Sequence, residues 1–146
     1  MTKISLYPEI SVPDVDDLLI GTDVESSNKD TKNFTIQSIS DLIVPYKIYN
    51  AILTQEDTYN PVATVLQNTL EGVVVWTRDA EGIYLGTLSG AFPTNKTLVQ
   101  AINSAHKLTD VNNSSSNAIE ITTRSLLTGD PTDGFTKMSV EIKVYE

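Results

Sequence analysis

The stretch VVVWTRDAEGIYLGTL, residues 73–88, carries the clearest structural signal in the chain. Two runs rich in β-branched and aromatic residues flank the segment 79–82, which ends in glycine. Gly82 can take the positive φ that a short hairpin loop demands. The pattern therefore predicts a β-hairpin.

Strands of the same kind are predicted on both sides of this hairpin. YKIYNAIL, residues 46–53, alternates as a strand does, and Pro61 opens the β-branched run VATVLQNTL. Near the C-terminus two more segments alternate, and their apolar faces consist of Ile119, Ile121 and Thr123 in the first and of Val140, Ile142 and Val144 in the second. Short strands separated by Gly, Pro, Asn and Asp predict a mainly β fold, a compact antiparallel β-sandwich or small barrel over residues 46–146.

The segment KTLVQAINSAHKL, residues 96–108, fits two structures equally well. Its apolar residues recur at helical spacing, yet the part from Leu98 to Ile102 would also serve as a strand. Periodicity alone does not decide between helix and strand for residues 97–108. The following VNNSSSN, residues 111–117, is predicted to be an exposed polar loop.

Residues 1–45 differ from the rest of the chain and are predicted to form an arm. They are rich in acidic residues and lack the dense apolar pattern of a separate core. Pro8 and Pro13 favour extended backbone at the start. A hairpin follows, with strands at 18–24 and 32–36 around a polar turn.

A short helix is predicted after the hairpin, ending before Pro45. Its apolar residues have helical spacing, and Ser38 with Asp41 has the form of a capping box. A lone hairpin with one or two helical turns is marginally stable in water. We therefore expect this arm to be ordered by another surface: its own C-terminal domain, a symmetry mate or another protein.

Composition limits the classes of function. The chain has 146 residues, no cysteine and a formal net charge of −9, and its basic residues are scattered. Disulfides and thiolate chemistry are excluded, and binding to nucleic acid or to an anionic membrane is disfavoured. Apolar runs are too short to span a bilayer, and no secretory signal is evident at the N-terminus, so we expect synthesis in a cytoplasm without membrane insertion.

The sequence predicts no catalytic residues, no metal site and no cofactor. His106 is the only histidine and has no nucleophile motif beside it, so we expect a surface or loop histidine. We interpret the cluster Asp14, Asp16 and Asp17 as a solvated helix start. Trp76 and Tyr84 are candidates for glycan contact, although an aromatic residue within VVVW is more typical of a core.

Segments from both parts of the chain resemble small virion proteins of tailed bacteriophages. In the arm these are DLLIGTDV and TKNFTIQSISDLI, at residues 17–24 and 31–43. In the C-terminal part they are YKIYNAILTQ, PVATVLQNTLEGVVVWTR, GIYLGTLSGAF and SVEIKVYE. Together these segments are similar to head-fibre, decoration or tail-fibre proteins, including those of crAss-like phages.

The resemblance implies a non-enzymatic structural protein of the virion, with head attachment favoured over tail attachment because the chain is short. Residues 1–45 would be the docking arm on capsid or tail proteins, and residues 46–146 would face outward, as a homotrimer. The expected docking residues are Leu18, Leu19, Ile20, Phe34, Ile36 and Ile39. Two alternatives stay open: a tail-fibre or receptor-binding tip that recognises host surface glycan, and a polysaccharide-degrading enzyme with paired carboxylates among Glu71, Asp79 and Glu81.

Overall fold

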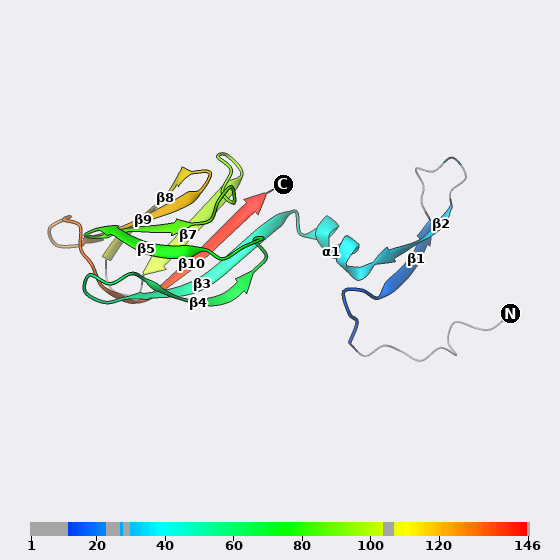
Figure 1. Cartoon of the computed structure of the whole chain (residues 1–146), viewed down its shortest axis with the longest axis horizontal. Helices are drawn as coiled ribbons and strands as arrows, with labels where there is room; N and C mark the ends of the chain where they lie inside the picture. Colours follow the sequence, from blue (N-terminus) through cyan, green and yellow to red (C-terminus); the bar gives the residue numbers. More distant parts are fainter. Residues whose placement is uncertain (1–11, 23–26, 28–29, 104–106, 146) are drawn as a thin grey trace. The chain divides into compact units, whose positions relative to one another are not determined.

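The computed structural model describes residues 12–22, 27, 30–103 and 107–145 (Figure 1). The chain divides into two compact units, Met1–Pro45 and Tyr46–Glu146, and this boundary is where the composition changes. Both units contain antiparallel strands, and the one helix in the described part of the chain is short. The predicted mainly β fold is confirmed.

The N-terminal unit contains a hairpin and a helix: β1 (Leu18–Thr22), β2 (Thr31–Thr35) and α1 (Ile36–Ile43). Leu19 pairs with Phe34 across the hairpin. The Phe34 ring lies over Gly21, because a Cβ at that position would be 2.8 Å from the ring. Glycine therefore allows the ring to cover the strand. Residues 1–11 and most of the polar turn lie outside the described residues.

The predicted capping box at Ser38 is wrong. Thr35 is the N-cap of α1, and its hydroxyl accepts a hydrogen bond from the Ser38 amide at 3.0 Å. The side-chain oxygen of a threonine at this position satisfies one of the free amides in the first helical turn. Because the second strand ends at Thr35, the helix begins three residues earlier than a cap at Ser38 would allow.

The acidic cluster before β1 is a turn, and the predicted helix start is wrong. The Asp17 amide donates to the Asp14 carbonyl at 3.1 Å, and the Asp14 amide donates to an Asp17 carboxylate oxygen at 2.8 Å. The turn also accepts hydrogen bonds from the first turn of α1, because Ile36 N donates to Asp17 O and Gln37 N donates to Val15 O. The turn thus fixes where the helix begins within this unit.

The C-terminal unit is a sandwich of two four-stranded antiparallel sheets (Figure 1). The first sheet has the order β4-β3-β10-β7 and consists of β4 (Val62–Asn68), β3 (Tyr46–Gln55), β10 (Phe135–Tyr145) and β7 (Thr97–Asn103). The second has the order β5-β6-β9-β8 and consists of β5 (Val75–Ala80), β6 (Ile83–Thr87), β9 (Ala118–Ser125) and β8 (Lys107–Ser115). The predicted 73–88 hairpin is β5–β6, and Gly82 has a φ of 67° as expected.

The segment that fitted both helix and strand forms strands. Residues 97–103 are β7, and residues 107–115 are β8 in the other sheet, while His106 lies outside the described residues. The polar loop predicted at 111–117 is wrong over Val111–Ser115, which belongs to β8. Val111 pairs with Ile121 of β9. The neighbouring strand therefore provides hydrogen-bond partners for the backbone of this segment, which in an exposed loop would bond to water.

The core lies between the two sheets, and the predicted apolar faces of β9 and β10 are buried there. The buried residues on these two strands are Ile119, Ile121, Thr123, Phe135, Met138, Val140, Ile142 and Val144. Trp76 from the second sheet donates its indole N–H to the Tyr49 hydroxyl of the first at 3.1 Å. The outer six-membered ring of Trp76 rests on Gly86, where a Cβ would lie 2.7 to 2.9 Å from three ring atoms.

We expect Gly86→Ala to destabilise the sandwich because the added methyl overlaps the Trp76 ring. Overpacking of this kind costs about 1–3 kcal/mol. Phenylalanine lacks the ring atoms that Gly86 contacts, so the same substitution in a Trp76→Phe background should cost at least about 1 kcal/mol less. Denaturant unfolding followed by circular dichroism measures all four proteins, and equal costs in both backgrounds would contradict the proposed packing.

Candidate functional site

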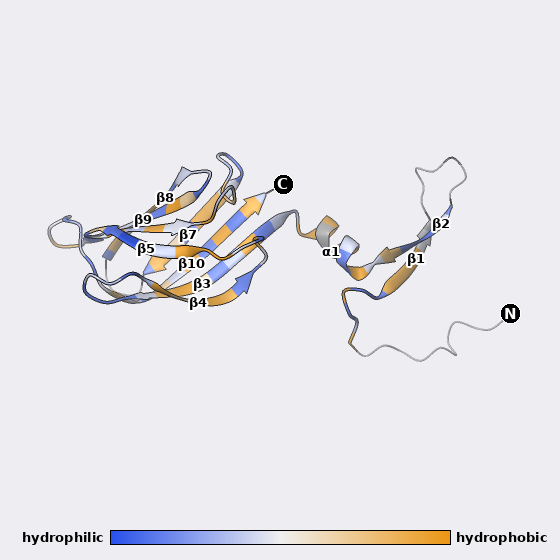
Figure 2. Ribbon diagram, in the orientation of Figure 1, coloured by the Kyte–Doolittle hydropathy of each residue, from blue (hydrophilic) through white to orange (hydrophobic). Residues whose placement is uncertain are grey.

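The expected docking residues differ in exposure. Leu18, Leu19 and Ile20 of β1 are exposed, whereas Phe34, Ile36 and Ile39 are partly buried. Figure 2 shows β1 as a hydrophobic strand in the N-terminal unit. The docking residues expected from the sequence did not include Leu42 and Ile43 of α1, which are 82% and 71% exposed. Their helical spacing was the available signal, since they continue the apolar series of 36 and 39.

The hairpin presents its exposed apolar side chains on both faces. Leu18 and Ile20 pair with Thr35 and Asn33, so they share one face with polar neighbours. Leu19 lies on the other face opposite Phe34. The β1 side chains are therefore available for contact, while Phe34 is part of the hairpin itself.

The two predicted glycan-contact residues are wrong, because both side chains belong to the core. Trp76 is 5% exposed and Tyr84 is 0% exposed. Trp76 packs on Gly86, and the Tyr84 ring meets the Phe135 ring edge to face with centroids 5.2 Å apart. Neither ring offers a face on which a sugar could stack.

Tyr84 instead takes part in a polar network at the end of the sandwich where β3 ends, at Gln55. Its hydroxyl donates to Asp133 Oδ1 at 2.9 Å and lies 3.2 Å from Gln55 Oε1. Burial and the bond to Asp133 raise the pKa of Tyr84 to about 12. The phenol is therefore neutral at ordinary pH. It links β6 of the second sheet to Gln55, the last residue of β3 in the first sheet.

Asp133 receives hydrogen bonds from several elements. Arg78 of β5 donates to its Oδ2 through Nε at 3.0 Å and Nη2 at 2.7 Å, and the Gly82 amide donates to Oδ1 at 2.9 Å. Burial alone would raise the pKa of Asp133, but the bonds from Arg78, Gly82 and Tyr84 outweigh it and lower the pKa. Lys107 of β8 donates to the Asp133 carbonyl. The carboxylate thus joins the β5–β6 turn to the start of β10.

Gln55, a buried polar residue, shapes the adjoining loop. Its amide nitrogen donates to the carbonyl oxygens of Asp57 at 2.6 Å and Tyr59 at 3.0 Å. Asp57 has a φ of 49°, a left-handed conformation that is uncommon for residues other than glycine. The hydrogen bonds from Gln55 hold this conformation, and backbone strain that is maintained by its surroundings is often found at functional sites.

This loop forms one wall of a groove of about 770 Å³, here called the distal groove. Its other wall is the start of β10, at residues 134–136. Tyr59 is 72% exposed at the groove, and Glu56, Asp57 and Asn60 are exposed beside it. An exposed ring flanked by carboxylates and an amide can stack on a sugar and hydrogen-bond its hydroxyls. Tyr59 is the functional candidate that sequence reasoning missed.

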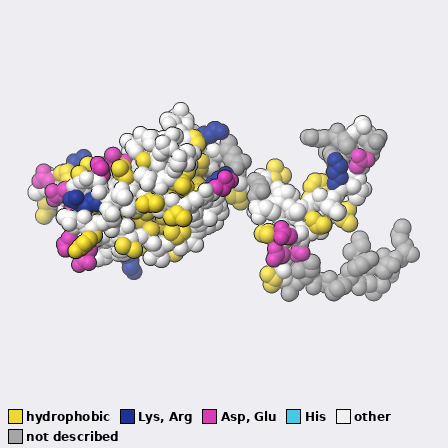
Figure 3. Space-filling model, viewed as in Figure 1, with side chains coloured by type: hydrophobic (Ala, Val, Ile, Leu, Met, Phe, Trp, Pro, Cys, Tyr) yellow, Lys and Arg dark blue, Asp and Glu magenta, His cyan; other side chains and the backbone are white. Residues whose placement is uncertain are grey.

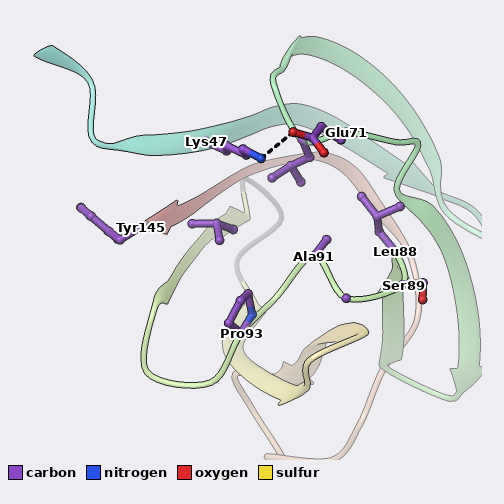
Figure 4. A pocket seen from close by; sticks show the side chains of 10 residues that line it. Lys47, Glu71, Leu88, Ser89, Ala91, Pro93 and Tyr145 are labelled. Atoms are coloured by element: carbon purple, nitrogen blue, oxygen red, sulfur yellow. Dashed lines mark hydrogen bonds and ion pairs between the residues drawn. The ribbon is translucent and has the colours of Figure 1, made fainter. Parts of the chain in front are cut away.

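A smaller pocket of about 290 Å³ lies at the other end of β3 (Figure 4). Lys47 and Glu71 point toward each other across it and form an ion pair of 2.7 Å, with Leu88, Ala91 and Pro93 on the remaining walls. The pair lowers the pKa of Glu71, first through the hydrogen bond from Lys47. The Glu71 side chain is largely exposed, so water screens this ion pair and it adds little to stability.

The described residues contain no cluster of three or more His, Cys, Asp or Glu side chains that could hold a metal ion. Within the same described ranges, no helix is long and apolar enough to cross a membrane. Comparison with protein families, with curated proteins and with solved structures found no match to this chain.

We expect Tyr84→Phe to change the alkaline stability of the chain. A folded-state pKa of about 12 lies above the unfolded value near 10, so the stabilisation by neutral Tyr84 is complete below pH 10 and is lost as pH rises toward 12. In that window the free energy of unfolding of the wild type should fall by about 1.4 kcal/mol per pH unit because of Tyr84. Tyr84→Phe should be less stable than wild type at pH 7, but its free energy of unfolding should fall less than that of wild type between pH 10 and 12. Urea unfolding at each pH tests this, and identical slopes would contradict it.

Proposed function

We propose that the chain is a non-enzymatic structural protein of a bacteriophage virion, a head-fibre or capsid-decoration subunit. Residues 1–45 dock on a capsid or tail protein, and residues 46–146 are displayed outward in a homotrimer. The observation that carries the proposal is the exposed apolar surface of the small N-terminal unit, formed by Leu18, Leu19, Ile20, Leu42 and Ile43. The segments DLLIGTDV and TKNFTIQSISDLI resemble virion proteins, and this resemblance supports capsid or tail proteins as the partners of this surface.

Docking would remove exposed apolar side chains of the N-terminal unit from water and thereby stabilise it. A hairpin and one short helix bury too little apolar area for independent stability. Transfer of one large apolar side chain from water into an interface contributes about 1.5–3 kcal/mol. Several such side chains on β1 and at the end of α1 would together stabilise both the unit and its attachment.

The C-terminal unit fits the outward role. It has its own core between two sheets, so its folding does not need the docking surface. Residues 46–146 contain eleven acidic and seven basic residues, and this excess of negative charge favours solubility and opposes non-specific binding to nucleic acid. A displayed virion subunit requires a domain with its own core, joined to a unit that has exposed apolar side chains for attachment.

We expect the double variant Leu18→Asp with Ile20→Asp to be lost from purified virions. Both side chains are exposed and share one face of the hairpin, so the charges leave the fold intact but oppose burial at the docking site. Phe34 is unsuitable for this test, since its ring covers Gly21 within the hairpin. Quantitative mass spectrometry of purified particles gives the copy number.

The matched control places two aspartates on the C-terminal unit, as Leu126→Asp with Leu127→Asp. These leucines are 54% and 96% exposed, so the change in charge and apolar area is comparable. The control should be incorporated at wild-type copy number. Equal incorporation of the β1 variant would refute the docking role of the arm.

The distal groove favours a second candidate function, a tip that binds host surface glycan. Tyr59 offers an exposed ring next to the exposed side chains of Glu56, Asp57 and Asn60. The buried Gln55 side chain holds the loop in one conformation, which lowers the entropic cost of ligand binding. This proposal replaces Trp76 and Tyr84 by Tyr59 as the aromatic residue that contacts the sugar.

An array of bacterial surface polysaccharides tests the glycan function. Saturable binding by wild type should fall at least tenfold in Tyr59→Ala, because the stacking of a sugar on the tyrosine ring is lost, while the substitution at this exposed position leaves the fold unchanged. Tyr145→Ala is the control, since Tyr145 is 41% exposed and lies at the pocket near the start of β3. Absence of saturable binding, or an equal loss in both variants, would exclude a glycan site in the distal groove.

A further inference from the structure

The charged residues that line the distal groove are both acidic. Glu56 and Asp57 are exposed, and no lysine or arginine is among the described residues of the groove walls. Lys137 follows the groove residue Thr136 in β10 but does not itself line the groove. A ligand in the groove therefore meets two carboxylates without a basic side chain in the walls to offset their charge.

The arginine next to this loop does not offset that charge either. Asn60 Oδ1 accepts a hydrogen bond from the Arg78 amide at 2.9 Å, so the backbone of Arg78 lies beside the groove. The Arg78 guanidinium, however, is hydrogen-bonded to Asp133 Oδ2, and both side chains of this ion pair are mostly buried. The positive charge of Arg78 is thus matched within the sandwich, and the groove stays acidic.

The loop between β3 and β4 presents its side chains to water because its carbonyl groups turn inward. Besides its hydrogen bonds to the Asp57 and Tyr59 carbonyls, the Gln55 amide nitrogen donates to the Glu56 carbonyl at 3.3 Å. The Tyr59 amide donates to the same Glu56 carbonyl at 3.1 Å. Figure 3 shows acidic and hydrophobic side chains side by side at the end of the C-terminal unit where this loop lies.

Two carboxylates beside an exposed aromatic ring are suited to an ammonium group. The carboxylates of Glu56 and Asp57 can form charge-assisted hydrogen bonds with it, and the face of the Tyr59 ring attracts a cation. A neutral sugar lacks this attraction between opposite charges, and an anionic sugar would be repelled. The sign of the charge in the groove therefore discriminates between classes of glycan.

The remaining polar groups of the groove favour a sugar over a simple cation. Thr54 of β3 and Thr136 of β10 line the groove and are exposed, so hydroxyl groups come from two strands. A sugar ring carries several hydroxyl groups that such side chains can bond. The excess of acidic residues in 46–146 acts at longer range, because it attracts polycations and repels anionic polysaccharides.

We propose that the distal groove binds glycans built from amino sugars whose amino group is free and protonated. Glu56 and Asp57 select these sugars over N-acetylated and anionic ones, and Tyr59 stacks on the sugar ring. The inference rests on the glycan function proposed for this groove and names the class of sugar that it takes.

The test measures the affinity of the full chain for short oligomers of glucosamine and of galactosamine, and for the N-acetylated forms of the same length and linkage. Isothermal titration calorimetry is carried out in weakly acidic buffer, in which the sugar amines are protonated. The amine forms should bind at least about tenfold more tightly, since ionic hydrogen bonds are the stronger ones. Added salt should weaken their binding. An oligomer of a uronic acid should not bind.

The charge variant is Glu56→Gln with Asp57→Asn, which removes both charges and keeps the size of the side chains. Asparagine is tolerated at the φ of 49° that Asp57 adopts. Affinity for the amine forms should fall at least about tenfold, while affinity for the N-acetylated forms should be unchanged. The matched control, Glu81→Gln with Asp110→Asn, removes the same charge from exposed positions outside the groove and should leave both affinities unchanged.

Fluorescence of Trp76, the single tryptophan, reports whether each variant is folded, because its ring is buried in the core. If the double variant does not fold, Glu56→Gln alone is compared with Glu81→Gln. These two single variants make the same chemical change at two exposed positions, one inside and one outside the groove.

Several results would overturn the inference, and they are distinguishable from failure of the glycan function. Binding of the N-acetylated forms as tightly as the amine forms, or equal losses in the charge variant and its control, would show that the carboxylates do not select the sugar. Either result leaves the glycan function intact if binding still depends on Tyr59. Tighter binding of a lysine oligomer would identify a basic peptide as the ligand instead. Absence of binding by both amine forms would also overturn the inference, and the polysaccharide array then decides separately on the glycan function.

Discussion

The burial of Tyr84 is the constraint on which the far end of the sandwich depends. A phenol removed from water needs a hydrogen-bond partner, and here Asp133 provides it beside Gln55. A buried carboxylate in turn needs donors, which Arg78 and the Gly82 amide supply. These requirements fix the β5–β6 turn against the start of β10. They also orient Gln55, which shapes the loop of the distal groove, so one buried hydroxyl links the core to the candidate site.

Local pattern was sufficient to predict many of the strands but not their partners. The 73–88 hairpin was predictable because Gly82 permits the turn and the flanking residues favour strands. The order of strands in the sheets was not, because β10 lies between β3 and β7, which are distant in sequence. The strand at Val111–Ser115 was missed for a related reason. Its polar residues favour a loop locally, and only pairing with β9 makes a strand more favourable.

The candidate site was harder to predict than the fold, because exposure decides whether an aromatic ring can bind a ligand. Trp76 and Tyr84 lie in the continuous apolar runs VVVW and IYL, which are typical of buried strands, so their burial agrees with the signal that predicted the hairpin. Tyr59 lies in the polar segment TYNP before β4, a composition typical of turns. That position favours exposure. The groove beside it depends on Gln55 and on the start of β10, which no local pattern connects.

The edges of the two sheets are protected in different ways. Two open sheets have four edge strands at which other chains could pair, and charged residues on β5 and β8 oppose pairing at those two strands. Net negative charge opposes association over the rest of the surface. β4 has no charged residue, but the extra residue Leu66 interrupts its register with β3, and a β-bulge of this kind turns an edge strand away from regular pairing. The apolar side chains of Val62, Val65 and Leu66 therefore stay exposed at an edge whose protection comes from backbone geometry and not from charge.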